Sequence, residues 1–108
     1  MSAALYRYPV FLTEDDWKSA VTGYENRVRR FRAASRLDQA ERVRSAMTEA
    51  AADCIPDGNE FRYVLHLTEE DYGFLSEAVT DRRNGVSREV VERIDHELSM
   101  AAGDATEL

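Results

Sequence analysis

The sequence resembles itself at two places, and this repeat constrains the fold more than any other feature. Residues 6–17 align with residues 61–72 without a gap, and six of the twelve positions are identical. A second block aligns residues 40–43 with residues 91–94. The offset is 55 residues in the first block (from 6 to 61) and 51 in the second (from 40 to 91). A repeat of this length identifies a building unit of about half the chain.

The length and composition predict one globular domain covering residues 1–108. A chain of 108 residues with 44% apolar residues can bury a single core and is too short for two. No apolar run is long enough to cross a membrane, and we expect no secretory signal at the start of the chain. Cys54 is a lone cysteine, which excludes an internal disulfide. We therefore expect a cytoplasmic protein.

Each repeat opens with the alternation of apolar residues that is typical of a strand. The alternating residues are Tyr6, Tyr8, Val10 and Leu12 in the first repeat, and Phe61, Tyr63, Leu65 and Leu67 in the second. Pro9 lacks a backbone N–H, so we expect the first strand to lie at an edge or to leave this position unpaired.

A threonine followed by three acidic residues ends each strand pattern. The segments are residues 13–16 and 68–71. A threonine hydroxyl can accept a hydrogen bond from a backbone N–H in the first helical turn, and acids there oppose the positive end of the helix dipole. Capping thus accounts for these acids, and we favour it over paired catalytic carboxylates or a metal site.

Apolar stripes at helical spacing predict two helices in each repeat. In the first repeat the helices run from Trp17 to Phe31 and from Ser35 to Cys54. In the second repeat one helix runs from Tyr72 to Asn84-Gly85, and the other runs from Ser87 to Gly103.

The predicted fold class is therefore α+β, with the element order β-α-α-β-α-α. The repeat units cover residues 5–54 and 60–102, joined by a turn at 55–59 and followed by a polar tail at 103–108. We expect two central antiparallel strands covered by four helices about an internal pseudo-two-fold axis. A two-stranded sheet is marginal, so an open strand edge would also allow a homodimer.

No catalytic or metal-binding motif is present in the sequence. His66 falls on a strand without an adjacent partner that would make it a ligand or general base, so we expect a structural histidine. His96 lies in a helix between Asp95 and Glu97, where we expect a solvated surface position. Cys54 falls on an apolar stripe, where buried thiols are usually inert. We expect no enzymatic activity, no metal and no cofactor.

The charge of the chain is concentrated in its second half. Residues 1–54 carry nine Lys or Arg and eight Asp or Glu, whereas residues 55–108 carry five and thirteen. The simplest interpretation of these acids is a solvated face that keeps the protein soluble. The more specific interpretation is a surface that binds a basic partner protein. Phe74 lies off the core stripe of its helix, so it is either an exposed interface anchor or a residue packed beneath a neighbouring helix. The predicted partner-binding residues are Glu69, Glu70, Phe74, Glu77, Asp81, Glu89, Glu92 and Asp95.

Size and charge suggest an analogy for the function. Small acidic proteins include inhibitors of nucleic-acid-handling machines, such as phage-encoded anti-defence and anti-CRISPR proteins, and the analogy extends to size and charge alone. We therefore expect a non-enzymatic protein-binding module.

The alternative is a nucleic-acid-binding regulator that uses an arginine cluster around Phe31. Arginines can grip phosphates, yet near a helix C-terminus they also complement the helix dipole. The net charge of −7 opposes binding to a duplex, so nucleic acid is the less favoured partner. The cluster consists of Arg27, Arg29, Arg30, Arg32 and Arg36.

Overall fold

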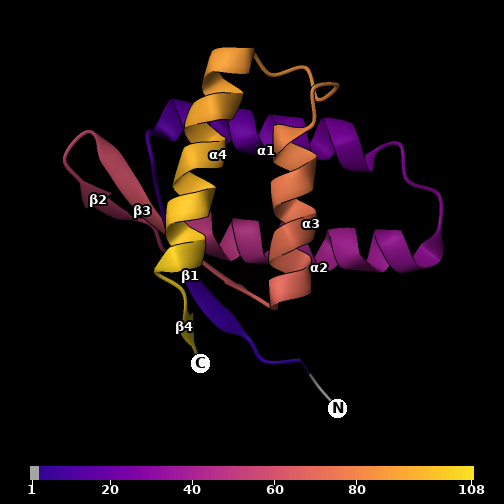
Figure 1. The fold of residues 1–108 in the computed structure, drawn as a ribbon, viewed down its shortest axis with the longest axis horizontal. Helices are drawn as coiled ribbons and strands as arrows, with labels where there is room; N and C mark the ends of the chain where they lie inside the picture. The colour runs from indigo at the N-terminus through magenta and orange to yellow at the C-terminus, as the bar shows by residue number, and fades with distance from the viewer. Residues whose placement is uncertain (1–2) are drawn as a thin grey trace.

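A computed structural model describes residues 3–108 of the chain (Figure 1). Within these residues the fold is α+β, as expected, with four helices and a four-stranded antiparallel sheet. In chain order the elements are β1 (Tyr6–Leu12), α1 (Glu14–Val28), α2 (Ala34–Ala52), β2 (Ile55–Asp57), β3 (Glu60–Leu67), α3 (Glu69–Thr80), α4 (Arg88–Gly103) and β4 (Thr106–Glu107).

The sheet has the strand order β2-β3-β1-β4, with β1 and β3 paired antiparallel at its centre. Pro9 stands opposite Val64 in the middle of this pair. The expectation from Pro9 that β1 lies at an edge is wrong. However, β4 pairs only with Tyr6 and Arg7, the first two residues of β1. The side of β1 next to Pro9 therefore meets no residue of β4, and the missing N–H costs no bond in that ladder.

The expectation of a two-stranded sheet is wrong, because two short strands extend it. Residues 55–57, expected to belong to a turn, form β2 against β3, and residues 106–107 of the expected polar tail form β4 against β1. Gly58 joins β2 to β3 with a φ of 65°, which suits the first position of a two-residue hairpin turn. Both strands are too short and too polar to show an alternating pattern.

The helices cover one face of the sheet, and the core lies between them. Six residues of the central strands point into this core and are at most 4% exposed: Tyr8, Val10, Leu12, Tyr63, Leu65 and Leu67. The side chains of Arg7, Arg62 and His66 alternate with these and are exposed on the opposite face. α2 packs on β3 and α4 packs on β1, while α1 crosses α3 (Figure 1).

Among residues 3–108 three ion pairs link the two halves of the chain, and two of them form at the start of a helix. Arg93 on α4 donates to Asp16 on α1 through Nε (2.8 Å) and Nη2 (2.9 Å). Arg42 on α2 donates to Asp71 on α3 through Nε (3.0 Å) and Nη2 (3.2 Å). Each carboxylate lies in the first turn of a helix, where a negative charge is favourable.

Two aromatic stacks link the halves as well. The rings of Tyr8 and Tyr72 stack with centroids 3.7 Å apart, and those of Trp17 and Tyr63 with centroids 4.0 Å apart. Each stack joins a strand residue to a helix residue of the other half, so the two halves share a single core.

The expected caps hold for two of the four helices. The Oγ1 atoms of Thr13 and Thr68 accept hydrogen bonds from the backbone N–H groups of Asp16 and Asp71, both at 3.1 Å. By contrast, α2 begins at Ala34, one residue before the expected start at Ser35, and its N-cap residue Ala33 offers no side-chain hydrogen bond. Ser87 precedes α4, but its side chain also makes no cap hydrogen bond.

Helix α3 ends four residues earlier than predicted. Its last residue is Thr80, and residues 81–87 form a loop to α4. Asn84, expected at the helix end, is instead a fully buried residue of this loop and Gly85 follows it with a φ of 80°. The left-handed glycine thus serves the loop rather than the helix terminus.

Candidate binding site between α2 and α3

The predicted acidic residues do not form one continuous face. Glu70 and Glu77 line a groove between α2 and α3, whereas Glu89 and Glu92 line a second hollow beside α4. Glu69 and Asp95 are exposed but line neither. Asp81 lies in the loop after α3, where it pairs with arginines.

Phe74 is buried, so the expectation of an exposed anchor is wrong and the alternative, packing beneath a neighbouring helix, is correct. The residue is 6% exposed, and its ring contacts Tyr24 edge-on (centroids 6.2 Å apart) and lies 5.5 Å from Phe31. The reason is that α3 is packed by α1, α2 and α4 together, so more than one stripe of it is covered.

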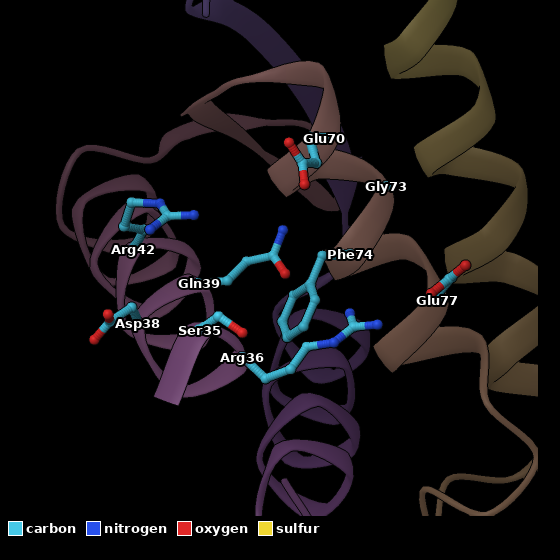
Figure 2. A pocket seen from close by; sticks show the side chains of 9 residues that line it. All are labelled: Ser35, Arg36, Asp38, Gln39, Arg42, Glu70, Gly73, Phe74 and Glu77. Atoms are coloured by element: carbon cyan, nitrogen blue, oxygen red, sulfur yellow. The ribbon is translucent and has the colours of Figure 1, made fainter. Parts of the chain in front are cut away.

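The groove between α2 and α3, called here the α2–α3 groove, is the largest hollow described and measures about 660 Å³. Its walls carry charges of both signs, and Phe74 forms part of its lining (Figure 2). The lining residues are Ser35, Arg36, Asp38, Gln39 and Arg42 from α2, and Glu70, Gly73, Phe74 and Glu77 from α3.

Below the groove, Asp71 organises the α2 wall. Its carboxylate accepts hydrogen bonds from Arg42 and, at 3.0 Å, from Gln39 Nε2. Burial alone would raise the pKa of Asp71, but the hydrogen bonds from Arg42 and Gln39 together outweigh it and leave the pKa below its usual range. Asp71 is therefore ionised at neutral pH, and it neutralises Arg42.

Gly73 opens the α3 wall of the groove. It lies in the interior of a helix, where glycine costs about 1 kcal/mol relative to alanine. A Cβ at this position would meet nothing within 4 Å, so packing within the described chain does not require a glycine there. An isolated glycine inside a helical pattern is a sequence signal that could have drawn attention to this position. Gln39 carried no such signal.

The second hollow, called here the α4 hollow, is strongly acidic. It measures about 460 Å³ and is lined by Leu12, Asp16, Glu60, Glu89, Glu92, Arg93, His96 and Glu97. Its arginine, Arg93, is held by Asp16 in the ion pair described above. The pKa of Glu97 is raised, first by burial and then by the charge of Glu60, as expected in a negative environment. Glu60 and Glu97 were not predicted site residues.

The five arginines of the predicted cluster fall into two groups, and the first group contacts the ring of Phe31. The guanidinium carbons of Arg27 and Arg36 lie 4.8 Å and 5.8 Å from the centroid of the Phe31 ring. Arg32 donates through Nη1 to the backbone carbonyls of Arg29 and Phe31, both at 3.0 Å. Arg29 and Arg30 are exposed.

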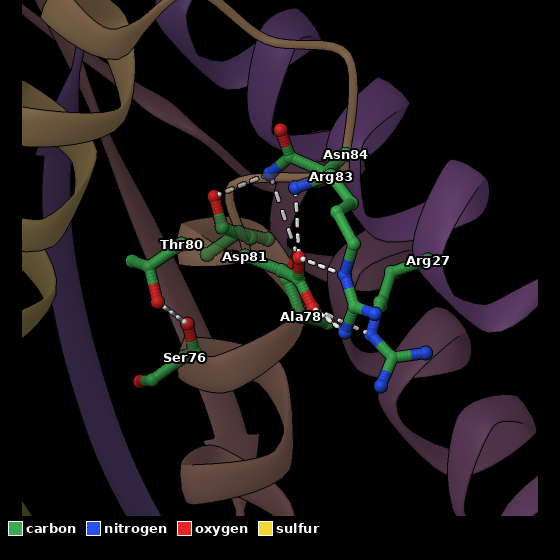
Figure 3. A network of polar contacts seen from close by, with 8 residues as sticks. Arg27, Ser76, Ala78, Thr80, Asp81, Arg83 and Asn84 are labelled. Carbon is green, nitrogen blue, oxygen red and sulfur yellow. Dashed lines mark hydrogen bonds and ion pairs between the residues drawn. The ribbon is translucent and has the colours of Figure 1, made fainter.

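Arg83, from the loop after α3, is linked to this cluster through Asp81, and sequence reasoning missed it. Asp81 accepts hydrogen bonds from Arg27 Nε (2.8 Å) and from both the backbone and the side chain of Arg83 (Figure 3). The hydrogen bonds from Arg83, with the nearby Arg27, lower the pKa of Asp81 from 3.8 to about 2. Arg82 is exposed next to this pair.

The remaining candidates for chemistry are dispersed. His66 and His96 are both exposed, one on the sheet and one on α4, and Cys54 is half-buried. Among residues 3–108 no group of three or more His, Cys, Asp or Glu side chains is arranged to hold a metal ion. In the same part of the chain no helix combines the length and apolarity needed to span a bilayer.

Comparison with known proteins gives no relative on which a function could be based. The chain matches no protein-family model, no curated protein and no solved structure.

Proposed function

We propose that this protein is a non-enzymatic binding module whose acidic surface holds a basic partner protein. The observation that carries the proposal is the α4 hollow. Four glutamates surround it (Glu60, Glu89, Glu92 and Glu97), while its arginine is already neutralised by Asp16. A concave surface of one charge sign concentrates its field and attracts the opposite charge.

The raised pKa of Glu97 supports this reading. Burial and the neighbouring Glu60 both disfavour its ionised form, so an incoming cation would relieve an existing cost. Arg88 pairs with Glu92 along the exposed side of α4, so the excess of acid in the hollow comes from Glu60, Glu89 and Glu97. A Lys- or Arg-rich segment is the partner chemistry that fits such a surface.

A partner of this kind suits an inhibitor of a nucleic-acid-handling machine, because the nucleic-acid channels of such machines are basic. Support comes from the size and charge of the chain and from the acidic hollow. Identifying the bound partner would identify the machine.

Binding of a fluorescent nona-arginine peptide, followed by anisotropy, tests the proposal. We expect binding that weakens as salt rises, because exposed charges are screened over about 8 Å at physiological ionic strength. Glu89→Gln with Glu92→Gln should weaken it. The matched control is Glu49→Gln with Asp53→Asn, which removes two exposed acids that line neither hollow. Equal weakening by both double variants would show a net-charge effect and refute a specific acidic site.

We also propose that the two halves derive from one duplicated β-α-α unit and are related by a pseudo-two-fold axis. Support comes from two of the ion pairs between the halves. The sequence alignment sets Asp16 over Asp71 and Arg42 over Arg93, and each arginine binds the aspartate of the other half. An experimental structure in which residues 5–54 and 60–102 fail to superpose would contradict the duplication.

A second candidate function, nucleic-acid binding, has one observation in its favour. Arg83 and Arg27 both bind Asp81, so an arginine of the loop after α3 extends the cluster around Phe31. Arginines with a central aromatic ring suit single-stranded nucleic acid. A gel shift abolished by Arg29→Ala with Arg30→Ala would favour this function over the first.

A further inference from the structure

The α2–α3 groove contains a hydrogen-bond acceptor that lacks a donor. Gln39 is 8% exposed, and its Nε2 donates to Asp71. Because an ionised carboxylate only accepts, this bond fixes the amide orientation and turns Oε1 away from Asp71. Figure 2 shows Oε1 pointing into the groove on the side of Phe74. No donor from residues 3–108 bonds to it, and it is open to solvent rather than buried, so it can accept a hydrogen bond from a partner.

The charges around this oxygen favour a cationic donor. Asp38, Glu70 and Glu77 are exposed in the lining, and Arg42 is neutralised by Asp71. Arg36 is the remaining cation of the lining, and its guanidinium carbon lies 5.9 Å from the centroid of the Phe74 ring. The position of Arg36 shows that a guanidinium can rest against this ring.

The wall opposite Gln39 gives a partner's backbone room to approach. The open space beside Gly73 lies between Glu70 and Glu77 on the same helix (Figure 2). A side chain at position 73 would fill this space.

We propose that the α2–α3 groove receives an arginine side chain of the basic partner. Its guanidinium donates to Gln39 Oε1, lies between Glu70 and Glu77, and displaces Arg36 from Phe74, while the partner's backbone passes over Gly73. Arginine fits better than lysine, because a planar guanidinium can donate to an amide oxygen and a carboxylate at once. This inference rests on the proposed function and assigns it a second contact site.

Titrations of the full chain with the nona-arginine peptide test the groove through three substitutions. Gly73→Ala and Gly73→Leu should raise the melting temperature, since both residues favour a helix, and should weaken binding progressively. Gln39→Met should weaken binding about fivefold, as expected for the loss of one hydrogen bond. Arg36→Gln should strengthen binding, because it removes the cation that the peptide must displace. Gly103→Ala, at the end of α4 and also in open space, is the matched glycine control and should leave binding unchanged.

The outcomes separate this inference from the proposed function. If Arg36→Gln weakens binding, the peptide does not displace Arg36 and the inference is overturned. If the Gly73 and Gln39 variants bind like the wild type while Glu89→Gln with Glu92→Gln weakens binding, the groove is not used and the proposed function stands. If the wild type does not bind the peptide, both fail. Binding weakened at Gly73 in a protein that has become more stable would support the groove, because misfolding could not explain it.

Discussion

Gly23 on α1 lies directly against the side chain of Asn84. A Cβ at position 23 would stand 2.8 Å from Asn84 Nδ2 and 3.1 Å from a methyl group of Val86. Asn84 is fully buried, its Nδ2 donates to the carbonyl of Val79 at 2.8 Å, and its Oδ1 accepts from the backbone N–H of Val86 at 3.0 Å. Asn26 on α1 donates through Nδ2 to the carbonyl of Asn84 at 2.8 Å, so Asn84 is bonded both within its own loop and to α1.

We expect Gly23→Ala to destabilise the protein. Alanine favours the helix by about 1 kcal/mol, but overpacking a tight contact typically costs about 1–3 kcal/mol and would also strain the bonds of Asn84. Urea denaturation measures the difference. Gly73→Ala is the control, because the same substitution in open space should stabilise the protein by about 1 kcal/mol. A stabilising Gly23→Ala would show that the contact of α1 with the α3–α4 loop has room for a methyl group.

The two threonine caps should contribute equally to stability. Each Oγ1 accepts one backbone N–H at 3.1 Å, so Thr13→Ala and Thr68→Ala should each cost about 1 kcal/mol. Ser87→Ala is the comparison, because Ser87 precedes α4 without a side-chain cap bond and its loss should cost less. Thermal melts of the three variants decide the matter, and a Ser87→Ala loss as large as that of the threonines would contradict the assigned caps.

Acid should weaken the contact of the α3–α4 loop with α1. The pKa of Asp81 is about 2 in the folded protein and ordinarily 3.8, so its ionised form stabilises the fold. Because the folded pKa is the lower one, this contribution is present above about pH 4 and is lost as the pH falls towards 2. Asp81→Asn lacks the charge at every pH, so its urea midpoint should lie below that of the wild type at neutral pH. The gap should close between pH 4 and pH 2, and a gap independent of pH would exclude the ion pairs with Arg27 and Arg83 as its cause.

The parts of the fold that could be predicted rest on signals close together in the sequence. The alternation in β1 and β3 and the threonine caps depend on residues within about one turn or strand of each other, so the chain displays them directly. β2 and β4 could not be predicted, because strands of three and two residues have no period. Their partners come from the tertiary fold.

The candidate binding site was harder to predict for the same physical reason. The burial of Phe74 was ambiguous, because the width of the buried stripe on α3 depends on how many helices pack around it. The periodicity of the α3 sequence does not give that number. The acceptor of Gln39 depends on Asp71, 32 residues further along the chain, and the ion pair of Arg93 with Asp16 spans 77 residues. The distribution of charge along the sequence locates most acids in the second half, but it could not show that they line two separate hollows.

Protein and nucleic acid can be separated as partners by one set of binding measurements. We expect no gel shift of duplex or single-stranded nucleic acid at physiological salt, because a net charge of −7 opposes the counterion release that drives such binding. Capture of the nona-arginine peptide should survive Arg29→Ala with Arg30→Ala, since neither exposed arginine lines the α2–α3 groove or the α4 hollow. It should weaken in Glu89→Gln with Glu92→Gln, mainly through slower association, as expected when charges at the rim of a site are removed. A gel shift that the arginine pair abolishes and the glutamate pair leaves intact would reverse the assignment and make the cluster around Phe31 the working surface.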